Sequence, residues 1–212
     1  MFSELARFSG VDATDWSWSV LLADYDNDGF KDIYITNGIL RRPNDLDYIN
    51  YDFPIKTGRV PSLELAHQMP EGKIPNYAYK NTGNLKFENV SKAWGLDLIG
   101  CSMGASYVDL DNDGDLDLVI NNLDQNPTIY KNNARSELKN NYLKVALKGP
   151  ENNPFGLGTK VKVEVGERTL VQELYPVRGW LSSSDMGLNF GLGQDSQLTS
   201  VEVRWPDGKT QY

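Results

Sequence analysis

The acidic stretch Asp24-Tyr-Asp26-Asn-Asp28-Gly-Phe30-Lys-Asp32 returns, in nearly the same design, as Asp109-Leu-Asp111-Asn-Asp113-Gly-Asp115-Leu-Asp117. Each copy carries carboxylates at positions 1, 3, 5 and 9 and a glycine at position 6. Carboxylates held this close together repel one another and raise one another's pKa unless a cation lies between them. Calcium takes about six to eight oxygen ligands and suits such a loop best. The sequence therefore predicts two calcium sites, one in each loop.

The expected ligands follow from the positions within each loop. Side chains at positions 1, 3, 5 and 9 bind the ion, position 7 supplies its main-chain oxygen, and the glycine makes the sharp turn. The first predicted site consists of Asp24, Asp26, Asp28, Asp32 and the carbonyl of Phe30. The second consists of Asp109, Asp111, Asp113, Asp117 and the carbonyl of Asp115. The alternative is an acidic surface turn that binds nothing, and the matched pair of loops argues against it.

The residues beside the loops decide which kind of calcium loop this is. An EF-hand needs a glutamate at position 12 and a helix on each side, but position 12 is Ile35 in the first loop and Ile120 in the second. Short apolar runs bounded by Gly and Asn flank both loops and predict strands. These runs are residues 19–23 and 33–36 around the first loop and 104–108 and 118–121 around the second. We therefore expect two β-hairpins and exclude both the EF-hand and the helical dockerin loop.

The two hairpins belong to an internal repeat. Asp24 and Asp109 lie 85 residues apart, and a second phrase, Tyr79-Lys-Asn-Thr82 and Tyr130-Lys-Asn-Asn133, follows each hairpin. Such self-similarity between short strands indicates a repeat architecture such as a propeller. The spacing exceeds a common blade of about 40–50 residues. We therefore expect an insertion at about residues 39–76, with a short helix at Ser62–Met69.

The hairpins resemble FG-GAP/VCBS repeats, the blades of integrin-α-like β-propellers. The phrase Tyr79-Lys-Asn-Thr-Gly-Asn-Leu-Lys-Phe87 resembles the link between blades, and Trp94-Gly-Leu96 is typical of the residues before a hairpin. The resemblance implies a propeller, calcium and a secreted or surface location. Two blades cannot close a ring of about four to eight. We therefore expect a partial propeller that further blades precede in the intact protein.

The last third of the chain resembles a second module. Five phrases follow one another there: Tyr142-Leu-Lys-Val-Ala-Leu-Lys-Gly149, Asn153-Pro-Phe-Gly-Leu-Gly158, Arg178-Gly-Trp-Leu-Ser-Ser183, Asn189-Phe-Gly-Leu-Gly193 and Val201-Glu-Val-Arg-Trp-Pro-Asp-Gly208. Together they resemble an ASPIC/UnbV domain, which follows VCBS repeats in the family related to cartilage acidic protein. Alternating residues at 160–165 and 201–204 predict a half-buried antiparallel sheet or sandwich. We therefore expect an all-β chain, with FG-GAP/VCBS repeats in residues 1–137 and a small sandwich-like ASPIC/UnbV domain in residues 138–212.

Composition narrows the classes of partner. The net charge of −8 argues against binding nucleic acid, which relies on clustered Lys and Arg. No stretch approaches the roughly 20 apolar residues of a membrane span. The single cysteine, Cys101, cannot form an internal disulfide, so cysteine usage does not decide the compartment. The resemblance and the expected calcium favour a secreted or cell-surface protein.

A few other residues could bind a ligand. Trp16 and Trp18 could stack on sugar rings, although tryptophans beside a blade strand usually fill the core. Arg178 and Trp180 lie in a hydroxyl-rich segment that could hold an anion or a sugar, or could form a hydrogen-bonded corner. His67 is the only histidine and has no motif around it, so we expect no catalytic use of it.

These observations predict a non-enzymatic, calcium-binding extracellular or surface module for adhesion or for recognition of a protein or glycan. One alternative is an enzyme on a propeller scaffold, such as a lyase or hydrolase with a metal acting as Lewis acid. The predicted ligands nearly complete a calcium shell, which leaves little room for a substrate. Another alternative is a structural spacer in a larger polypeptide.

Overall fold

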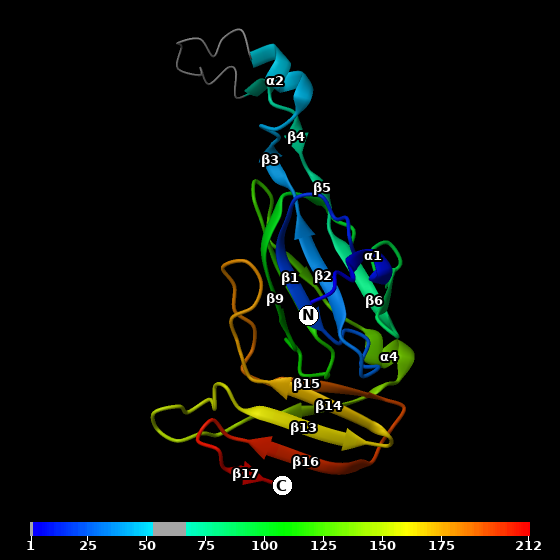
Figure 1. The fold of residues 1–212 in the computed structure, drawn as a ribbon, viewed down its shortest axis with the longest axis vertical. Helices are drawn as coiled ribbons and strands as arrows, with labels where there is room; N and C mark the ends of the chain where they lie inside the picture. The colour runs from blue at the N-terminus through cyan, green and yellow to red at the C-terminus, as the bar shows by residue number, and fades with distance from the viewer. Residues whose placement is uncertain (1, 53–66) are drawn as a thin grey trace.

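The structure is a computed structural model that describes residues 2–52 and 67–212. The fold is all-β, as predicted, and its described sheets are open (Figure 1). The two upper sheets carry the acidic loops, and the lower sheets are formed by the last third of the chain. The propeller closure that the repeats predict is not confirmed by these open sheets.

The first sheet carries the first acidic loop. Its four antiparallel strands run in the order β1-β2-β6-β7. The strands are β1 (Ser17–Ala23), β2 (Asp32–Asn37), β6 (Tyr77–Gly83) and β7 (Lys86–Asn89), and the short helix α1 (Ala6–Ser9) contacts β7. The loop joins β1 to β2, where Ala23 pairs with Asp32. The predicted strand-loop-strand hairpin is therefore confirmed here.

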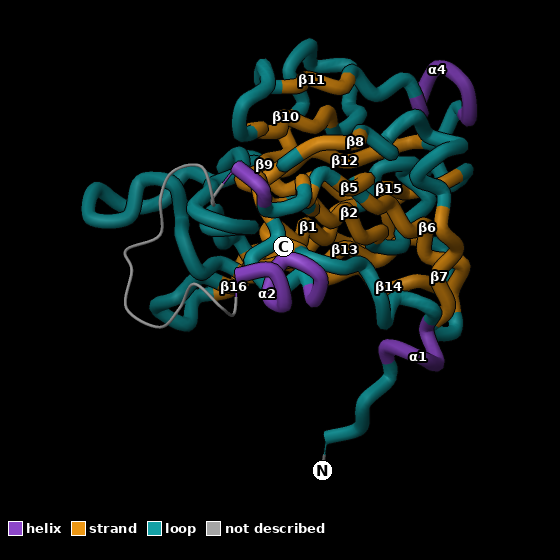
Figure 2. Tube along the Cα trace, turned by 90° about the horizontal axis from the view of Figure 1, so that it is seen from above, coloured by secondary structure: helices purple, strands orange, loops and turns teal. Residues whose placement is uncertain are grey.

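The second sheet repeats the hairpin. Its strands are β9 (Ser102–Val108), β10 (Asp117–Asn122) and β11 (Thr128–Tyr130), in the order β11-β10-β9. Val108 pairs with Asp117 just as Ala23 pairs with Asp32, so the second loop closes an equivalent hairpin. The two sheets lie side by side, with β9 against β1 and β2 (Figure 2). Between them lies a core of Leu21, Ala23, Tyr25, Tyr34, Ala78, Val90, Leu96, Ala105, Leu116, Leu118 and Ile120.

The segment between β2 and β6 extends beyond the ends of the two sheets (Figure 1). It contains β3 (Ile39–Arg41), α2 (Leu46–Asp52), β4 (Glu71–Gly72) and β5 (Ile74–Pro75), and β5 pairs with β8 (Ile99–Gly100). Because β2 and β6 are hydrogen-bonded neighbours, this segment adds no strand to the sheet between them. The structure thus places the predicted insertion at the far end from the acidic loops. The expected helix at Ser62–Met69 lies mostly outside the described residues.

The C-terminal unit, residues 138–212, follows the short helix α4 (Ala134–Leu138). Its strands are β12 (Asn141–Val145), β13 (Lys160–Val165), β14 (Arg168–Glu173), β15 (Leu188–Gly193), β16 (Leu198–Arg204) and β17 (Thr210–Gln211). A sheet of order β14-β13-β16-β17 and the pair β12-β15 enclose a second core of Val161, Val163, Val165, Leu174, Leu188, Phe190 and Leu192. The valines alternate along β13 and all point inward, which is the predicted period of two. The predicted antiparallel β structure of this unit is therefore present, and its sandwich-like form stays a prediction.

Among the described residues, no helix is long and apolar enough to span a bilayer.

Candidate metal centre

The two acidic loops adopt the same backbone conformation. Position 4 is left-handed in both, with φ of 56° at Asn27 and 60° at Asn112. Position 6 also has positive φ, 96° at Gly29 and 95° at Gly114. A side chain at such a φ is strained, and asparagine tolerates it better than most residues. The Asn and Gly of the sequence pattern are therefore the residues that let each loop curl round its carboxylates.

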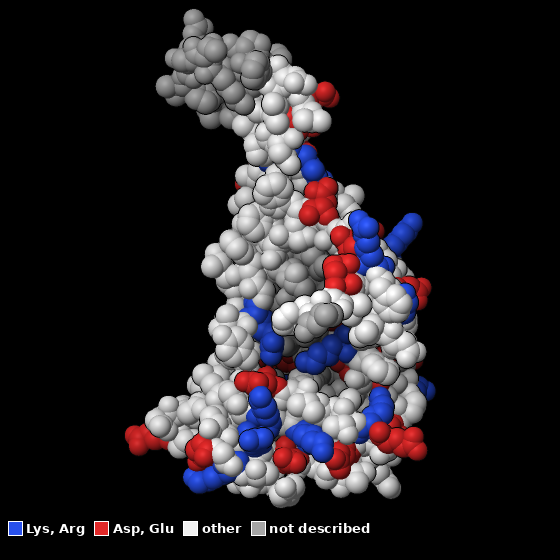
Figure 3. Space-filling view, viewed as in Figure 1, with Lys and Arg blue, Asp and Glu red and all other residues white. Residues whose placement is uncertain are grey.

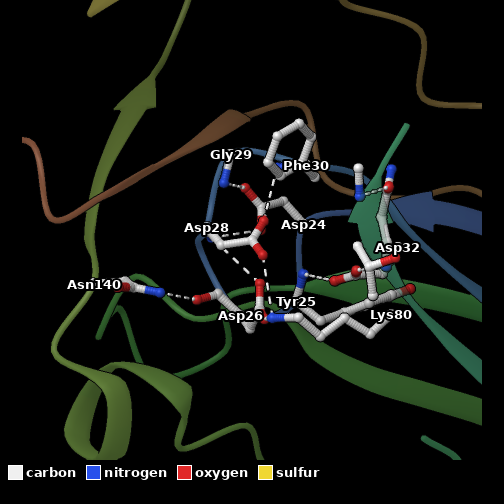
Figure 4. Close-up of polar contacts among 12 residues, drawn as sticks. Asp24, Tyr25, Asp26, Asp28, Gly29, Phe30, Asp32, Lys80 and Asn140 are labelled. Carbon is white, nitrogen blue, oxygen red and sulfur yellow. Dashed lines mark hydrogen bonds and ion pairs between the residues drawn. The ribbon is translucent and has the colours of Figure 1, made fainter. Parts of the chain in front are cut away.

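The first loop gathers three carboxylates at its centre. Asp24, Asp26 and Asp28 each offer an oxygen, and these oxygens lie within 4.8 Å of one another (Figure 4). Asp24 is 6% exposed and Asp26 is 4% exposed. The main chain fixes Asp24, since its Oδ1 accepts a hydrogen bond from Asp28 N at 3.0 Å and its Oδ2 accepts one from Gly29 N at 2.8 Å. The loop thus holds a compact set of buried oxygen ligands.

The second loop forms the matching cluster of Asp109, Asp111 and Asp113, with the same limit of 4.8 Å between oxygens. It is more open to solvent, because the side chain of Asp111 is 38% exposed. Asp109, in contrast, is 7% exposed, and its Oδ1 is buried without a hydrogen-bond partner in the described part of the chain. A buried carboxylate oxygen without a partner is costly. It is the kind of group that a bound cation would satisfy.

The carboxylates at position 9 accept hydrogen bonds from main-chain N–H groups in this structure. Asp32 accepts hydrogen bonds from Tyr25 N at 3.1 Å and from Asn81 N at 2.9 Å. Asp117 accepts the equivalent bonds from Leu110 N at 2.9 Å and Asn132 N at 2.8 Å. Each therefore ties its loop to the asparagine of the repeated Tyr-Lys-Asn phrase, which lies within β6 in the first repeat and just after β11 in the second. In each loop the structure brings together three of the four predicted side chains. In the first loop the fourth, Asp32, lies to one side of the cluster (Figure 4).

Position 7 differs between the two loops. Phe30 is 46% exposed, and its N–H donates to Asp28 Oδ1 at 2.8 Å. Asp115 is buried, and its carboxylate accepts hydrogen bonds from Asn27 Nδ2 at 2.8 Å and from Arg135 N at 2.7 Å. The side chain of Asp115 therefore joins the two loops and α4, which the sequence pattern did not reveal.

A lysine of the repeated phrase offsets part of the negative charge of each cluster. The Nζ of Lys80 bonds to Asp26 and lies 3.1 Å from Asp28 Oδ2 (Figure 4). Lys131 pairs with the second cluster in the same way, through Asp111 and, at 3.9 Å, Asp113. This role of the lysines was not predicted from the sequence. The signal was present, because Lys80 and Lys131 occupy the same position in the repeated phrases Tyr79-Lys-Asn-Thr82 and Tyr130-Lys-Asn-Asn133.

Burial shifts the pKa values of two carboxyls in the first loop strongly upward. It raises the pKa of Asp24 to about 7; the hydrogen bond from the Gly29 amide opposes this shift, and the charges of Asp28 and Asp26 add to it. Burial likewise raises the pKa of Asp32 to about 8; the Asn81 amide opposes the shift, and the charge of Asp26 adds to it. These carboxyls are therefore reluctant to ionise without a compensating cation.

A small cavity of about 30 Å³ lies where the loops meet the C-terminal unit, and the first residue of each loop, Asp24 and Asp109, lines it. Lys31, Lys144 and Arg178 line it as well. Lys144 Nζ lies 3.1 Å from Asp109 Oδ2, so the C-terminal unit also supplies a positive charge to the second cluster. Burial lowers the pKa of Lys31, and the charge of Arg178 lowers it further. Basic side chains are visible along this junction in Figure 3.

The predicted ligand-binding aromatics are only partly brought together. Trp18 and Trp180 pack against each other, with ring centroids 5.0 Å apart at 58°. Trp18 Nε1 donates to Gly38 O at 2.6 Å, and the Trp180 N–H donates to Ser19 Oγ at 2.7 Å. These contacts join the C-terminal unit to β1. Trp16 is 38% exposed, and Arg178 lines the cavity described above.

The donor set of each cluster suits a hard divalent cation. All the candidate ligands are oxygens, as calcium and magnesium prefer, and three carboxylates leave room for main-chain oxygens and water. The buried, partnerless oxygen of Asp109 and the raised pKa of Asp24 both favour a bound positive charge. The two clusters can therefore hold a metal ion.

Comparison with known proteins supports the resemblance seen in the sequence. Residues 149–212 match the family model described as "ASPIC and UnbV". The chain is 28% identical over 195 residues to cartilage acidic protein 1 of Xenopus tropicalis, in a match covering 90% of this chain and 26% of that protein. It is 27% identical over 241 residues to the human protein of the same name, in a match covering 98% of this chain and 36% of that protein. The chain thus spans about a quarter to a third of the length of the curated relatives it matches. The FG-GAP/VCBS identity of residues 1–137 stays a prediction.

Proposed function

We propose that this chain is a calcium-binding, non-catalytic module of a secreted or cell-surface protein. The observation that carries the proposal is the matched pair of three-carboxylate clusters, each on a β-hairpin loop of the same backbone conformation. The name of the matched relatives refers to cartilage and to acidity, which agrees with an extracellular place and with the net charge of −8.

Calcium would be held by Asp24, Asp26 and Asp28 in the first loop and by Asp109, Asp111 and Asp113 in the second. When bound, the ion supplies positive charge that lets these crowded carboxylates ionise together. Asp32 and Asp117 hold the loops in shape through main-chain N–H groups. A ligand that binds only the folded protein stabilises it, by about 2.7 kcal/mol at a hundredfold excess over Kd. The clusters would thus stiffen the fold.

We further propose that the stiffened fold recognises a protein or glycan. The support is the packed pair Trp18 and Trp180, in which Trp180 is 41% exposed, together with Trp16, which is 38% exposed, since aromatic rings offer large, rigid contact area. A glycan array with and without calcium is the direct assay. Calcium-dependent binding supports glycan recognition, whereas the absence of any binding rejects it.

The test of the calcium proposal is a calorimetric titration of the chelator-treated protein. The wild type should bind two calcium ions and melt at a higher temperature when loaded. Asp26→Asn and Asp111→Asn should each bind one ion, because each variant lacks a ligand of a single loop. Asp207→Asn, which changes an exposed carboxylate in the C-terminal unit, should still bind two. If EDTA leaves the melting temperature of the loaded wild type unchanged, the proposal fails.

A further inference from the structure

The main-chain carbonyls of the first loop accept hydrogen bonds from the C-terminal unit at three consecutive residues. Asn140 Nδ2 donates to Asp26 O at 2.8 Å (Figure 4). The Gly193 N–H donates to Asn27 O at 2.8 Å, and Arg168 Nη1 donates to Asp28 O at 2.7 Å. The stretch that carries two of the three candidate ligands is therefore also the stretch on which the C-terminal unit rests.

The second loop is held by the same unit. Asn189 Nδ2 donates to Gly114 O at 3.0 Å, and Lys144 reaches Asp109. The ring of Tyr142 lies so close to Gly114 that a Cβ at this position would collide with it. The second loop thus contacts β12 and β15, the two-stranded layer of the C-terminal unit, and the first loop contacts β14 and β15.

Gly191 brings the two parts into backbone contact at the first loop. A Cβ on Gly191 would collide with Asp24 Oδ2 and would lie 2.5 Å from the main chain of Asn27. The φ of Gly191 is not in the left-handed region, so its backbone conformation does not demand glycine. Space alone requires it here. A candidate calcium ligand, Asp24, therefore packs directly on a strand of the C-terminal unit.

The two loops also touch each other. Asn27 is fully buried, and its Nδ2 donates to Asp115 Oδ1 at 2.8 Å and to Gly114 O at 3.3 Å. A displacement of one loop therefore also displaces groups of the other loop and of the strands that contact them. These contacts make one three-way junction of the two loops and the C-terminal unit.

We infer that the two acidic loops are the docking surface for the C-terminal unit, and that metal binding and docking stabilise each other. This inference rests on the proposed calcium function. Without calcium a single lysine of the described residues faces three carboxylates, and their remaining repulsion makes the loop that presents the three carbonyls easier to open. With the cation bound, the carbonyls stay where Asn140, Arg168 and Gly193 need them. Coupling of this kind is reciprocal, so weaker docking must weaken metal binding by the same factor.

The distinctive test is to weaken docking by mutating residues that are not calcium ligands and then to measure calcium affinity. Arg168→Ala removes the hydrogen bond to Asp28 O, and Asn140→Ala removes the hydrogen bond to Asp26 O, so neither variant touches a carboxylate of the cluster. Both should weaken calcium binding to the first loop by about fivefold or more, the usual lower range of coupling between sites. Arg204→Ala, which changes an exposed arginine of β16, should leave the affinity unchanged.

Amide hydrogen exchange of the wild type reads docking directly. The Gly193 N–H, which donates to Asn27 O, should exchange faster when calcium is removed. The Leu174 N–H, which donates to Thr159 O inside the C-terminal unit, should exchange at the same rate with and without calcium, provided that the unit stays folded.

The outcomes separate the two claims. The docking inference is overturned if the wild type binds two ions, both variants keep wild-type calcium affinity, and the exchange rate of the Gly193 N–H is the same with and without calcium. The calcium function then stands. If the wild type binds no calcium, the proposed function fails and the inference fails with it.

Discussion

Two carboxyls in the first loop make the stability of the calcium-free protein depend on pH. Asp24 and Asp32 have pKa values of about 7 and about 8, raised by burial from an ordinary value of 3.8. Between the ordinary pKa of 3.8 and these raised values, the two carboxyls therefore keep their protons in the folded, calcium-free protein and lose them in the unfolded chain. Its stability is greatest in mild acid and falls as the pH rises through these values.

The expected result is a calcium-free melting temperature that falls between pH 5 and pH 8.5. The free energy of unfolding should drop by a few kcal/mol, since one pKa unit corresponds to about 1.4 kcal/mol. Calcium should remove most of this dependence and should bind more tightly as the pH rises, because binding displaces the protons. Scanning calorimetry across this range checks the prediction. Asp24→Asn should flatten the calcium-free profile, and a flat wild-type profile would contradict the account.

Lys80 acts as a tethered cation in the first cluster, through its contacts with Asp26 and Asp28. Lys80→Met removes that charge and keeps most of the side-chain volume. We expect the calcium-free protein to lose stability and calcium to bind about tenfold more tightly, because an ammonium at this range is worth on the order of 1 kcal/mol or more. Titration calorimetry measures the calcium affinity of the variant and of its control, and thermal melting without calcium measures their stability. Lys92→Met, at an exposed position outside the loops, should change neither quantity, and weaker binding by Lys80→Met would refute the idea.

At the scale of elements, the hairpins were predictable because short β-branched runs and the fixed Asp-Gly spacing are local signals. Residues 19–23 and 33–36 lie within β1 and β2, and the alternating residues 160–165 form β13. The role of the position-9 carboxylates was not predictable, because Asp32 and Asp117 bind the amides of Asn81 and Asn132, which lie outside their own hairpins. The pairing of Lys144 with Asp109 depends likewise on how two units dock. Spacing along the chain carries no such information.

The insertion gives a prediction at this scale. β3 pairs with β4, and the Arg42 N–H donates to Pro70 O at 2.9 Å, so the two ends of the intervening segment lie close together. Replacing residues 42–70 with a short Asn-Gly turn should therefore connect the strands without strain. The variant should bind two calcium ions and dock its C-terminal unit as the wild type does. Loss of calcium binding in a folded variant would show that the insertion supports the loops.

At the scale of the whole molecule, the two cores lie on either side of the acidic loops. One fills the space between the upper sheets and the other fills the C-terminal unit. The loops, together with the packing of Trp18 on Trp180, join these two bodies. The sequence did not predict this junction, because its contacts pair residues that are far apart in the chain. Closure into a propeller depends on blades that two repeats cannot supply, so it stays a prediction.

The central claim is that both loops bind calcium, and a crystal structure grown with calcium tests it most directly. The account predicts anomalous density in each loop, with carboxylate oxygens of Asp24, Asp26 and Asp28, and of Asp109, Asp111 and Asp113, at about 2.3–2.6 Å from the ion. Lys80 and Lys131 should then have moved away from the clusters they now neutralise. Empty loops at millimolar calcium, with both lysines still bound to the aspartates, would contradict the claim.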